Sequence, residues 1–177
     1  TRQKLNRETL KGWEQILIGA PDAVLWLLDP GKAMKHELLS ELSMIKNRVF
    51  FSPMVPVPKH LGRIRHANLF LDSFPYGAHT TASDAVFSGV PVLARTGSSF
   101  QSRVSWSIIH HAGLEDFHAN CWGSFIEKAS EFYKSFNYDR GMEIKKYLLD
   151  FDRPRHPYNI DWTTQEIERA YKQMLTD

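Results

Sequence analysis

The stretch DSFPYGAHTTASDAVFSGVPVL, residues 72–93, decides the fold of this chain. It reads as the end of a strand, a loop that contains Pro and Gly, a helix and a second strand. The loop delivers His79, Thr80 and Thr81 to the start of the helix, where unpaired backbone N–H groups and a partial positive charge attract phosphate. Asp84 lies one turn deeper on the same face, where its carboxylate can accept hydrogen bonds from sugar hydroxyls. The stretch therefore predicts a site for a nucleotide-sugar diphosphate.

Short apolar runs alternate with amphipathic stretches on both sides of this block. Such runs are typical of strands buried on both faces of a parallel sheet, and their alternation with helices predicts βαβ units. We therefore expect an α/β fold, with a Rossmann-like parallel sheet and helices on both of its faces. Ligands of such sheets bind beyond the carboxyl ends of the strands, where His79 lies. The expected strands are Val24–Leu28, Val49–Ser52, Leu69–Asp72 and Pro91–Ala94, and the expected helices are Glu8–Gly19, Ala33–Ile45, Lys59–Ala67, Thr80–Ser88 and Arg103–Ala112.

Beyond Leu114 the pattern becomes helical. We predict a single nucleotide-sugar-binding lobe over residues 1–177, with a Rossmann-like core at about 1–117 and a helical C-terminal extension at about 118–177. Asp161 is the expected N-cap of the last helix. The helices expected in the extension are Trp122–Ser135, Met142–Phe151 and Trp162–Leu175.

Composition is that of a soluble globular domain. The 177 residues are 42% hydrophobic and 24% charged, and the net charge of +2 gives no reason to expect nucleic acid or membrane as a partner. The single cysteine, Cys121, cannot form an internal disulfide, so we expect a reducing, cytoplasmic location and a small buried or half-buried apolar role for this side chain. No signal peptide or long apolar run is visible in the sequence.

Several motifs follow one another in a fixed order around the central block. They are Leu71-Asp72-Ser73, His79-Thr80-Thr81, Asp84, Gly89-Val90-Pro91 and Gly97-Ser-Ser-Phe100-Gln-Ser102-Arg103-Val104. In this order they resemble the donor-binding segment of the protein O-GlcNAc transferases, glycosyltransferase family 41. The resemblance runs from about residue 4 to about residue 117, and more loosely to the end of the chain.

The resemblance implies the C-terminal lobe of a two-lobed, GT-B type glycosyltransferase. The implied reaction is inverting transfer of GlcNAc from UDP-GlcNAc to Ser or Thr hydroxyls of acceptor proteins, without metal or cofactor. In the resembled family an N-terminal catalytic lobe and helical TPR repeats precede this segment, and neither is present here. We therefore expect the isolated chain to be inactive alone, and a nucleocytoplasmic location if it comes from a eukaryote.

The same resemblance assigns the groups that hold the departing diphosphate. Lys4 matches the lysine that stabilises the leaving nucleotide. A fixed ammonium can do so because it offsets the negative charge that develops on the diphosphate. His79, Thr80 and Thr81 match the groups that bind its oxygens. Taken alone, a lysine near a chain start is ordinary solvated surface, and two threonines at a helix start are ordinary caps. No general base is assigned.

Three further residues are implied to bind the nucleoside. Asp84 matches the residue that binds the ribose hydroxyls, and His60 and Arg63 match a pair near the uracil ring. A spacing of three places His60 and Arg63 on one face of a helix. The alternative for these two is a solvated amphipathic helix start.

Other functions remain open at this stage. The protein O-fucosyltransferases of the Spindly type share this framework, and the spelling Phe74-Pro75-Tyr76 occurs in that branch too. The run His79-Thr80-Thr81 followed by Asp84 favours the GlcNAc branch. Bacterial N-glycosylating relatives that transfer glucose are a further possibility. The last alternative is a non-catalytic module that keeps the fold for nucleotide or partner binding.

Overall fold

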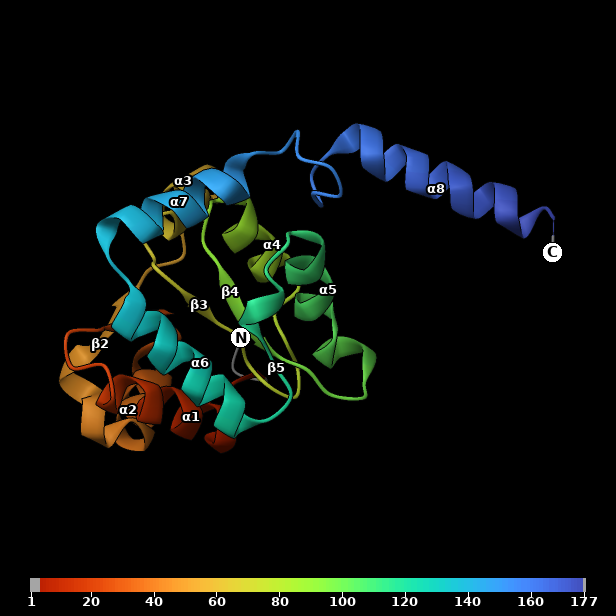
Figure 1. The fold of residues 1–177 in the computed structure, drawn as a ribbon. Coiled ribbons are helices and arrows are strands. Elements are labelled where there is room, and N and C mark those ends of the chain that lie inside the picture. Colours follow the sequence, from red (N-terminus) through yellow and green to blue (C-terminus); the bar gives the residue numbers. More distant parts are fainter. Residues whose placement is uncertain (1–3, 177) are drawn as a thin grey trace.

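The computed structural model describes residues 4–176 and shows an α/β fold with parallel strands, as predicted (Figure 1). The strands within these residues are β1 (Leu25–Leu28), β2 (Val49–Ser52), β3 (Phe70–Leu71), β4 (Val92–Arg95) and β5 (His118–Ala119). They form two hydrogen-bonded groups. In one group β1 and β2 pair in parallel, with Leu25 opposite Val49. In the other, β4 lies between β3 and β5 and is parallel to both.

Helices connect these strands and continue beyond them. Their bounds are α1 Arg7–Ile18, α2 Lys32–Glu41, α3 Val57–Ile64, α4 Thr80–Phe87, α5 Val104–His111, α6 Trp122–Ser135, α7 Tyr138–Leu149 and α8 Ile160–Met174. The second helix ends four residues earlier than predicted, and a 3₁₀ helix at Ser43–Arg48 then leads into β2.

Side chains of β4 alternate between two hydrophobic clusters. Leu93 packs in a cluster with residues of α1 and α6, whereas Val92 and Ala94 pack in a second cluster with residues of α4, α5 and α7. Each of the three is at most 1% exposed. Because successive side chains of a strand point to opposite faces, β4 is buried on both. Helices therefore cover both faces of this part of the sheet, which confirms the predicted layering.

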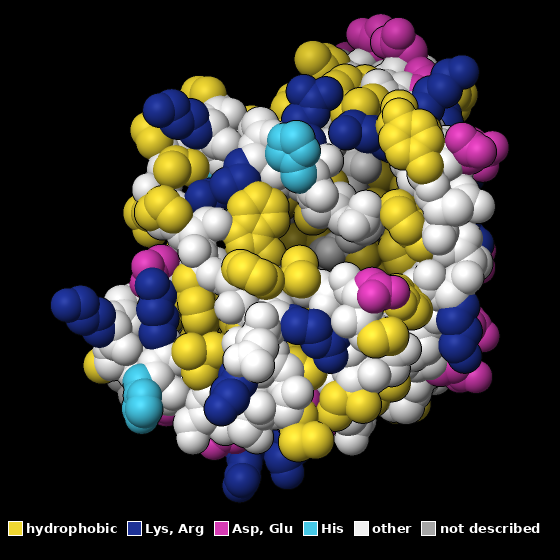
Figure 2. Space-filling view, turned by 90° about the vertical axis from the view of Figure 1, so that its left-hand side faces the viewer, with side chains coloured by type: hydrophobic (Ala, Val, Ile, Leu, Met, Phe, Trp, Pro, Cys, Tyr) yellow, Lys and Arg dark blue, Asp and Glu magenta, His cyan; other side chains and the backbone are white. Residues whose placement is uncertain are grey.

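The first two strands differ from the prediction, because one of their faces is open. Leu25 and Val49 pack into the first cluster, whereas Trp26, Leu28 and Phe50 are 38%, 49% and 55% exposed. Figure 2 looks onto the side of the molecule where β2 lies and shows hydrophobic side chains gathered around a hollow. An apolar run predicts a buried strand, but it does not reveal whether anything covers the second face.

The first helix shows why this segment packs where it does. Its N-cap, Asn6, accepts a hydrogen bond from the backbone N–H of Thr9 through its side-chain oxygen. Gly12 faces the indole of Trp122, and a Cβ at this glycine would lie 2.7 Å from two ring carbons. Glycine therefore allows α1 and α6 to approach closely. The predicted apolar face is buried, since Leu10, Trp13, Ile16 and Leu17 are all at most 6% exposed.

The part after Leu114 is helical as predicted, with one exception. The two-residue strand β5 pairs with β4, with Ala94 opposite His118, and sequence periodicity gave no sign of so short a strand. Asn159, not Asp161, caps α8, and its side chain accepts a hydrogen bond from the N–H of Trp162. The expected cap was wrong because either residue can cap, and only the backbone shows which one precedes the first turn.

The last helix, α8, extends away from the rest of the molecule (Figure 1). None of its residues is buried. Within residues 4–176, no helix has the length and apolar character that a membrane-spanning segment requires.

Candidate functional site

The loop at residues 72–79 carries the predicted phosphate-binding groups to the carboxyl end of β3. The amino end of α1 fixes this loop, because the Asn6 amide and the Thr9 hydroxyl both donate hydrogen bonds to the carbonyl of Phe74, at 2.7 and 2.9 Å. Thr9 is fully buried, so water does not compete for its bond. The loop therefore has a defined conformation without a ligand.

His79 lies at the end of this loop, directly before α4. Its ring stacks on Tyr76, with 5.2 Å between ring centroids and 21° between planes, and it meets the ring of Phe100 edge-on at 6.3 Å. One ring nitrogen, Nε2, lies 3.4 Å from the carbonyl oxygen of Gln101. These neighbours hold the imidazole beside the helix start.

Lys4, near the N-terminus, contacts the same loop. Its ammonium donates a hydrogen bond to the carbonyl of Gly77 at 2.7 Å and lies 4.4 Å from the centroid of the Tyr76 ring. Burial lowers the pKa of Lys4, and the negative charge of Asp72 opposes that shift. The structure thus brings Lys4 and His79 to the same aromatic ring.

The start of α4 is open. Thr80 and Thr81 are both exposed, and no side chain among the described residues caps the helix. The N–H groups of Ala82 and Ser83 donate to the carbonyl of His79. The N–H groups of Thr80 and Thr81 precede them and belong to the unpaired amides of a helix start. They can therefore donate to an anion that approaches from solvent.

Of the predicted nucleoside-binding residues, Asp84 and His60 lie close to each other, and Arg63 makes other contacts. One carboxylate oxygen of Asp84, Oδ2, lies 3.6 Å from Nε2 of His60, and both side chains are half-buried. Arg63 turns elsewhere: its guanidinium donates to the carbonyl of Pro53 at 2.8 Å and lies 5.6 Å from the ring centroid of Trp26. His60 and Arg63 thus make different contacts, although both come from α3.

Sequence reasoning did not assign a role to Asp72. This side chain is 2% exposed, and its Oδ1 accepts hydrogen bonds from the N–H groups of Ser73 and Ala78, at 2.8 and 2.6 Å. Burial raises its pKa to about 6, against the opposing effects of the Ser105 hydroxyl, these two N–H groups and the charge of Lys4. An acidic residue directly after a buried strand was the signal that could have found it.

Arg95, at the end of β4, is a second residue that the sequence did not single out. Its guanidinium carbon lies 3.8 Å from the centroid of the Phe74 ring and 5.0 Å from that of Trp122. One of its terminal nitrogens lies 3.3 Å from a carboxylate oxygen of Glu8. Arg95 therefore links the loop after β3 to α1 and α6, and its place in a strand gave no hint of these contacts.

The expectation for Cys121 was wrong, because this side chain is exposed. The residue is the N-cap of α6, and its sulfur accepts a hydrogen bond from the N–H of Ser124 at 3.4 Å. That bond is the main reason why the pKa of the thiol is lowered. A cysteine can cap a helix much as serine does, and composition alone does not show this.

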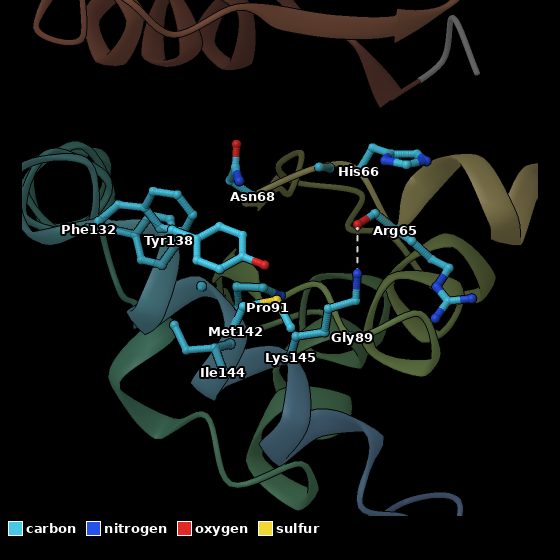
Figure 3. Close-up of a pocket in the computed structure, with 13 residues that line it drawn as sticks. Arg65, His66, Asn68, Gly89, Pro91, Phe132, Tyr138, Met142, Ile144 and Lys145 are labelled. Atoms are coloured by element: carbon cyan, nitrogen blue, oxygen red, sulfur yellow. Dashed lines mark hydrogen bonds between the residues drawn. The ribbon is translucent and has the colours of Figure 1, made fainter.

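A separate pocket lies away from this site, beside the turn between α3 and β3. It has a volume of about 280 Å³, and Arg65, Pro91, Tyr138, Met142 and Lys145 are among its lining residues. Figure 3 shows Lys145 reaching across to Arg65, where its ammonium donates to the backbone carbonyl at 3.3 Å. Because it adjoins the starts of β3 and β4, this pocket is not the predicted ligand site.

No three His, Cys, Asp or Glu side chains of the described chain are grouped closely enough to hold a metal ion. The groups that the site does offer are an ammonium, an imidazole, two threonines at an open helix start and a carboxylate one turn further on. Chemically, this set can bind an anion next to a polyhydroxyl group.

A parallel α/β fold with an open helix start beyond a strand end places the chain among the doubly wound proteins, which bind ligands at that edge. The family model for glycosyl transferase family 41 matches residues 2–154. The chain therefore belongs to this glycosyltransferase family, which includes the O-GlcNAc transferases and which the sequence motifs predicted.

Two curated relatives are similar over most of this chain. A UDP-N-acetylglucosamine–peptide N-acetylglucosaminyltransferase of Caenorhabditis elegans is 26% identical over 82% of this chain, and the match covers 13% of the relative. A probable enzyme of the same description, SPINDLY of Hordeum vulgare, is 23% identical over 97% of this chain and 19% of the relative. The chain thus spans less than a fifth of either protein.

A solved structure supports the fold. A mutant O-GlcNAc transferase of Thermobaculum terrenum matches 97% of this chain with a TM-score of 0.79 and 23% sequence identity. The match covers 34% of that protein. The fold of this chain therefore corresponds to about a third of that longer protein.

Proposed function

We propose that this chain is the donor-binding half of an enzyme that transfers GlcNAc from UDP-GlcNAc to Ser or Thr hydroxyls of proteins. One observation carries the proposal: Lys4 and His79 contact the same ring beside the open start of α4. These groups come from distant parts of the chain and match, residue by residue, those implied by the family resemblance. Family membership supports the same reaction.

In the proposed reaction, the acceptor hydroxyl displaces the diphosphate directly, with inversion at the anomeric carbon. Negative charge then develops on the diphosphate oxygens. The N–H groups and hydroxyls of Thr80 and Thr81 would bind these oxygens, and Lys4 would exchange the carbonyl of Gly77 for a phosphate oxygen. A fixed ammonium in a partly buried place stabilises that charge more strongly than water would.

The nucleoside would lie along the same face of α4. The Asp84 carboxylate would accept hydrogen bonds from the ribose hydroxyls, and the His60 imidazole would stack on the base. Their contact at 3.6 Å supports a shared ligand. Arg63 would reach the uracil ring only after leaving the carbonyl of Pro53. No metal or cofactor is needed in this scheme.

None of the residues named above is proposed to bind the acceptor protein. An N-terminal catalytic lobe and TPR repeats are the proposed partners, in the same polypeptide or as a separate chain. The acceptor protein would enter between the two lobes.

A second donor has one specific observation in its favour. Tyr76 belongs to the spelling Phe74-Pro75-Tyr76, which also suits the O-fucosyl branch, and its ring contacts both Lys4 and His79. GDP-fucose is therefore the competing donor in any binding test.

Calorimetric titration with UDP, UDP-GlcNAc and GDP-fucose tests the proposal. The complete gene product should bind UDP and UDP-GlcNAc more tightly than GDP-fucose. Thr81→Ala and Asp84→Ala should each lower the affinity for UDP by about tenfold. Asp139→Ala is the matched control, because Asp139 is an exposed carboxylate in the first turn of another helix, α7. Preference for GDP-fucose, or equal effects of the control and Asp84→Ala, would contradict the proposal.

A further inference from the structure

The loop at 72–79 is closed from the inside by one carboxylate. Oδ1 of Asp72 accepts hydrogen bonds from the N–H of Ser73 and from the N–H of Ala78. The first of these residues opens the loop and the second closes it, so a single atom fixes both ends. Hydrogen bonds to a charged acceptor are about twice as strong as neutral ones.

The carboxylate has no room to move. Asp72 is 2% exposed, its own carbonyl accepts a hydrogen bond from the Trp13 indole at 3.2 Å, and Gly77 lies close to its Oδ2. A Cβ at Gly77 would lie 3.0 Å from that oxygen and 3.2 Å from the carbonyl of Gln101. The backbone therefore approaches the carboxylate closely, and a larger residue at Gly77 would require this oxygen or the Gln101 carbonyl to give way.

The second oxygen of this carboxylate accepts no hydrogen bond within the described chain. Oδ2 of Asp72 is buried, and the nearby Ser105 hydroxyl, which favours the charged form of the carboxylate, donates its proton to the carbonyl of Ala78 instead. A buried carboxylate with an unpaired oxygen opposes folding, because desolvation is not fully compensated. Stability therefore does not account for a carboxylate at this position. Its hydrogen bonds to the loop do.

The groups that the carboxylate holds in place lie at the far end of the loop that follows it. Ala78 precedes His79, and Gly77 offers the carbonyl that Lys4 contacts at 2.7 Å. Ser105, which packs beneath the loop, donates a hydrogen bond to the carbonyl of Ala78. Both the N–H and the carbonyl of Ala78 are thus hydrogen-bonded. These two bonds fix the backbone directly before His79.

We propose that Asp72 is a positioning residue that fixes the loop so that Lys4 and His79 face the donor diphosphate. It acts through the backbone N–H groups of Ser73 and Ala78 and does not touch the donor. This inference rests on the proposed function for its ligand, but its effect on the loop can be measured without one.

Two substitutions separate hydrogen-bond acceptance from mere space filling. Asp72→Asn keeps an oxygen in the place of Oδ1, and its amide nitrogen replaces the unpaired Oδ2. Asp72→Ala removes the acceptor. Asp161→Ala is the control, since Asp161 is exposed on α8. All are made in the complete gene product, and folding is checked by circular dichroism.

The first measurement is amide hydrogen exchange at Ala78. We expect the Ala78 amide to be protected in the wild type and in Asp72→Asn, and to exchange at least about tenfold faster in Asp72→Ala. If the wild-type amide exchanges as fast as an unstructured one, the proposal is overturned. Should Asp72→Ala fail to fold, the Ala78 amide of the wild type and of Asp72→Asn is compared. Protection in both supports the proposal, and its absence in either overturns it.

The second measurement is UDP affinity. Asp72→Asn should stay within about threefold of the wild type, and Asp72→Ala should bind about tenfold or more weakly. Unchanged affinity in folded Asp72→Ala, or an equal loss in both variants, overturns the positioning role. If the wild type does not bind UDP while exchange at Ala78 still depends on Asp72, the proposed function fails and the role in the loop stands.

Discussion

Among single residues, Lys4 is the charge on which the proposed reaction depends most. The Lys4 ammonium is half-buried and within reach of Asp72, Tyr76 and Gly77. A lysine held in this way is preorganised, because little rearrangement is needed when negative charge develops beside it. Ordinary surface lysines have no such contacts.

Replacing Lys4 should therefore affect catalysis more than binding. We expect Lys4→Ala to lower kcat by about a hundredfold to a thousandfold, as removal of one group that stabilises transition-state charge does. The KM for the donor should change much less. Steady-state kinetics of the complete gene product measure both, with exposed Lys11 changed to alanine as the control. A kcat loss equal to that of Lys11→Ala would remove Lys4 from the mechanism.

The raised pKa of Asp72 predicts a pH dependence of stability. Its pKa is about 6 in the folded state and 3.8 in a solvated reference. Folding thus favours the protonated form, so this group's contribution is fully present below pH 4 and is lost as the pH rises through 6. The loss is about 3 kcal/mol, because one pKa unit corresponds to about 1.36 kcal/mol.

Denaturant unfolding at several pH values measures this effect. The difference in unfolding free energy between the wild type and Asp72→Asn should shift in favour of the variant between pH 4 and pH 7. Other carboxylates titrate equally in both proteins and cancel in the difference. A difference that does not change with pH would mean that Asp72 keeps an ordinary pKa.

At the scale of elements, close packing between helices decides which substitutions are tolerated. Gly12 of α1 faces the Trp122 indole of α6, whereas Gly62 of α3 has nothing within 4 Å of the place where a Cβ would lie. Both glycines are inside helices, so alanine gains about 0.5–1 kcal/mol of helix propensity at either. Only at Gly12 does a clash oppose that gain.

We therefore expect opposite signs at these two positions. Gly12→Ala should lower the free energy of unfolding by about 1–3 kcal/mol, because the added methyl group pushes α1 and α6 apart. Gly62→Ala should raise it by up to about 1 kcal/mol. Thermal and denaturant unfolding give both values. A stabilising Gly12→Ala would mean that the two helices do not meet as described.

Sequence patterns predicted most elements because their burial is regular. The apolar face of α1 and the run that forms β4 carry clear periodicities, and the structure buries both. The strand β5 was missed because two residues carry no period. The exposed face of β1 and β2 was missed because a run of apolar residues does not say what covers it.

The sequence motifs proposed the residues of the candidate site, but they did not reveal how these residues lie relative to one another. Motifs indicated Lys4, His79, Thr80, Thr81 and Asp84, and the structure places Lys4 and His79 together. The separation of Arg63 from His60 depends on the carbonyl of Pro53, which no residue pattern reveals. Asp72 was visible as a residue after a strand, but its burial and its two N–H partners are tertiary facts.

At the scale of the whole molecule, the chain corresponds to a part of its relatives. It covers 34% of the matched solved structure, and the face formed by Trp26, Leu28 and Phe50 lacks a cover among the described residues. Exposed apolar faces of this kind often belong to interfaces.

The isolated chain should therefore be a poor enzyme. We expect no detectable GlcNAc transfer by the 177 residues alone, and weaker UDP binding than in the complete gene product, because the proposed function assigns the acceptor side to a separate lobe. A radiolabelled transfer assay on both proteins tests this. Turnover by the isolated chain above the uncatalysed rate would show that these residues suffice.

An NMR titration of the amide-labelled chain with UDP shows which backbone groups meet the diphosphate. If the start of α4 binds the diphosphate, the backbone amides of Thr80 and Thr81 should show the largest shift changes, with smaller ones near Gly77. Largest changes around Arg65 and Lys145, at the opposite end of the strands, would contradict the account.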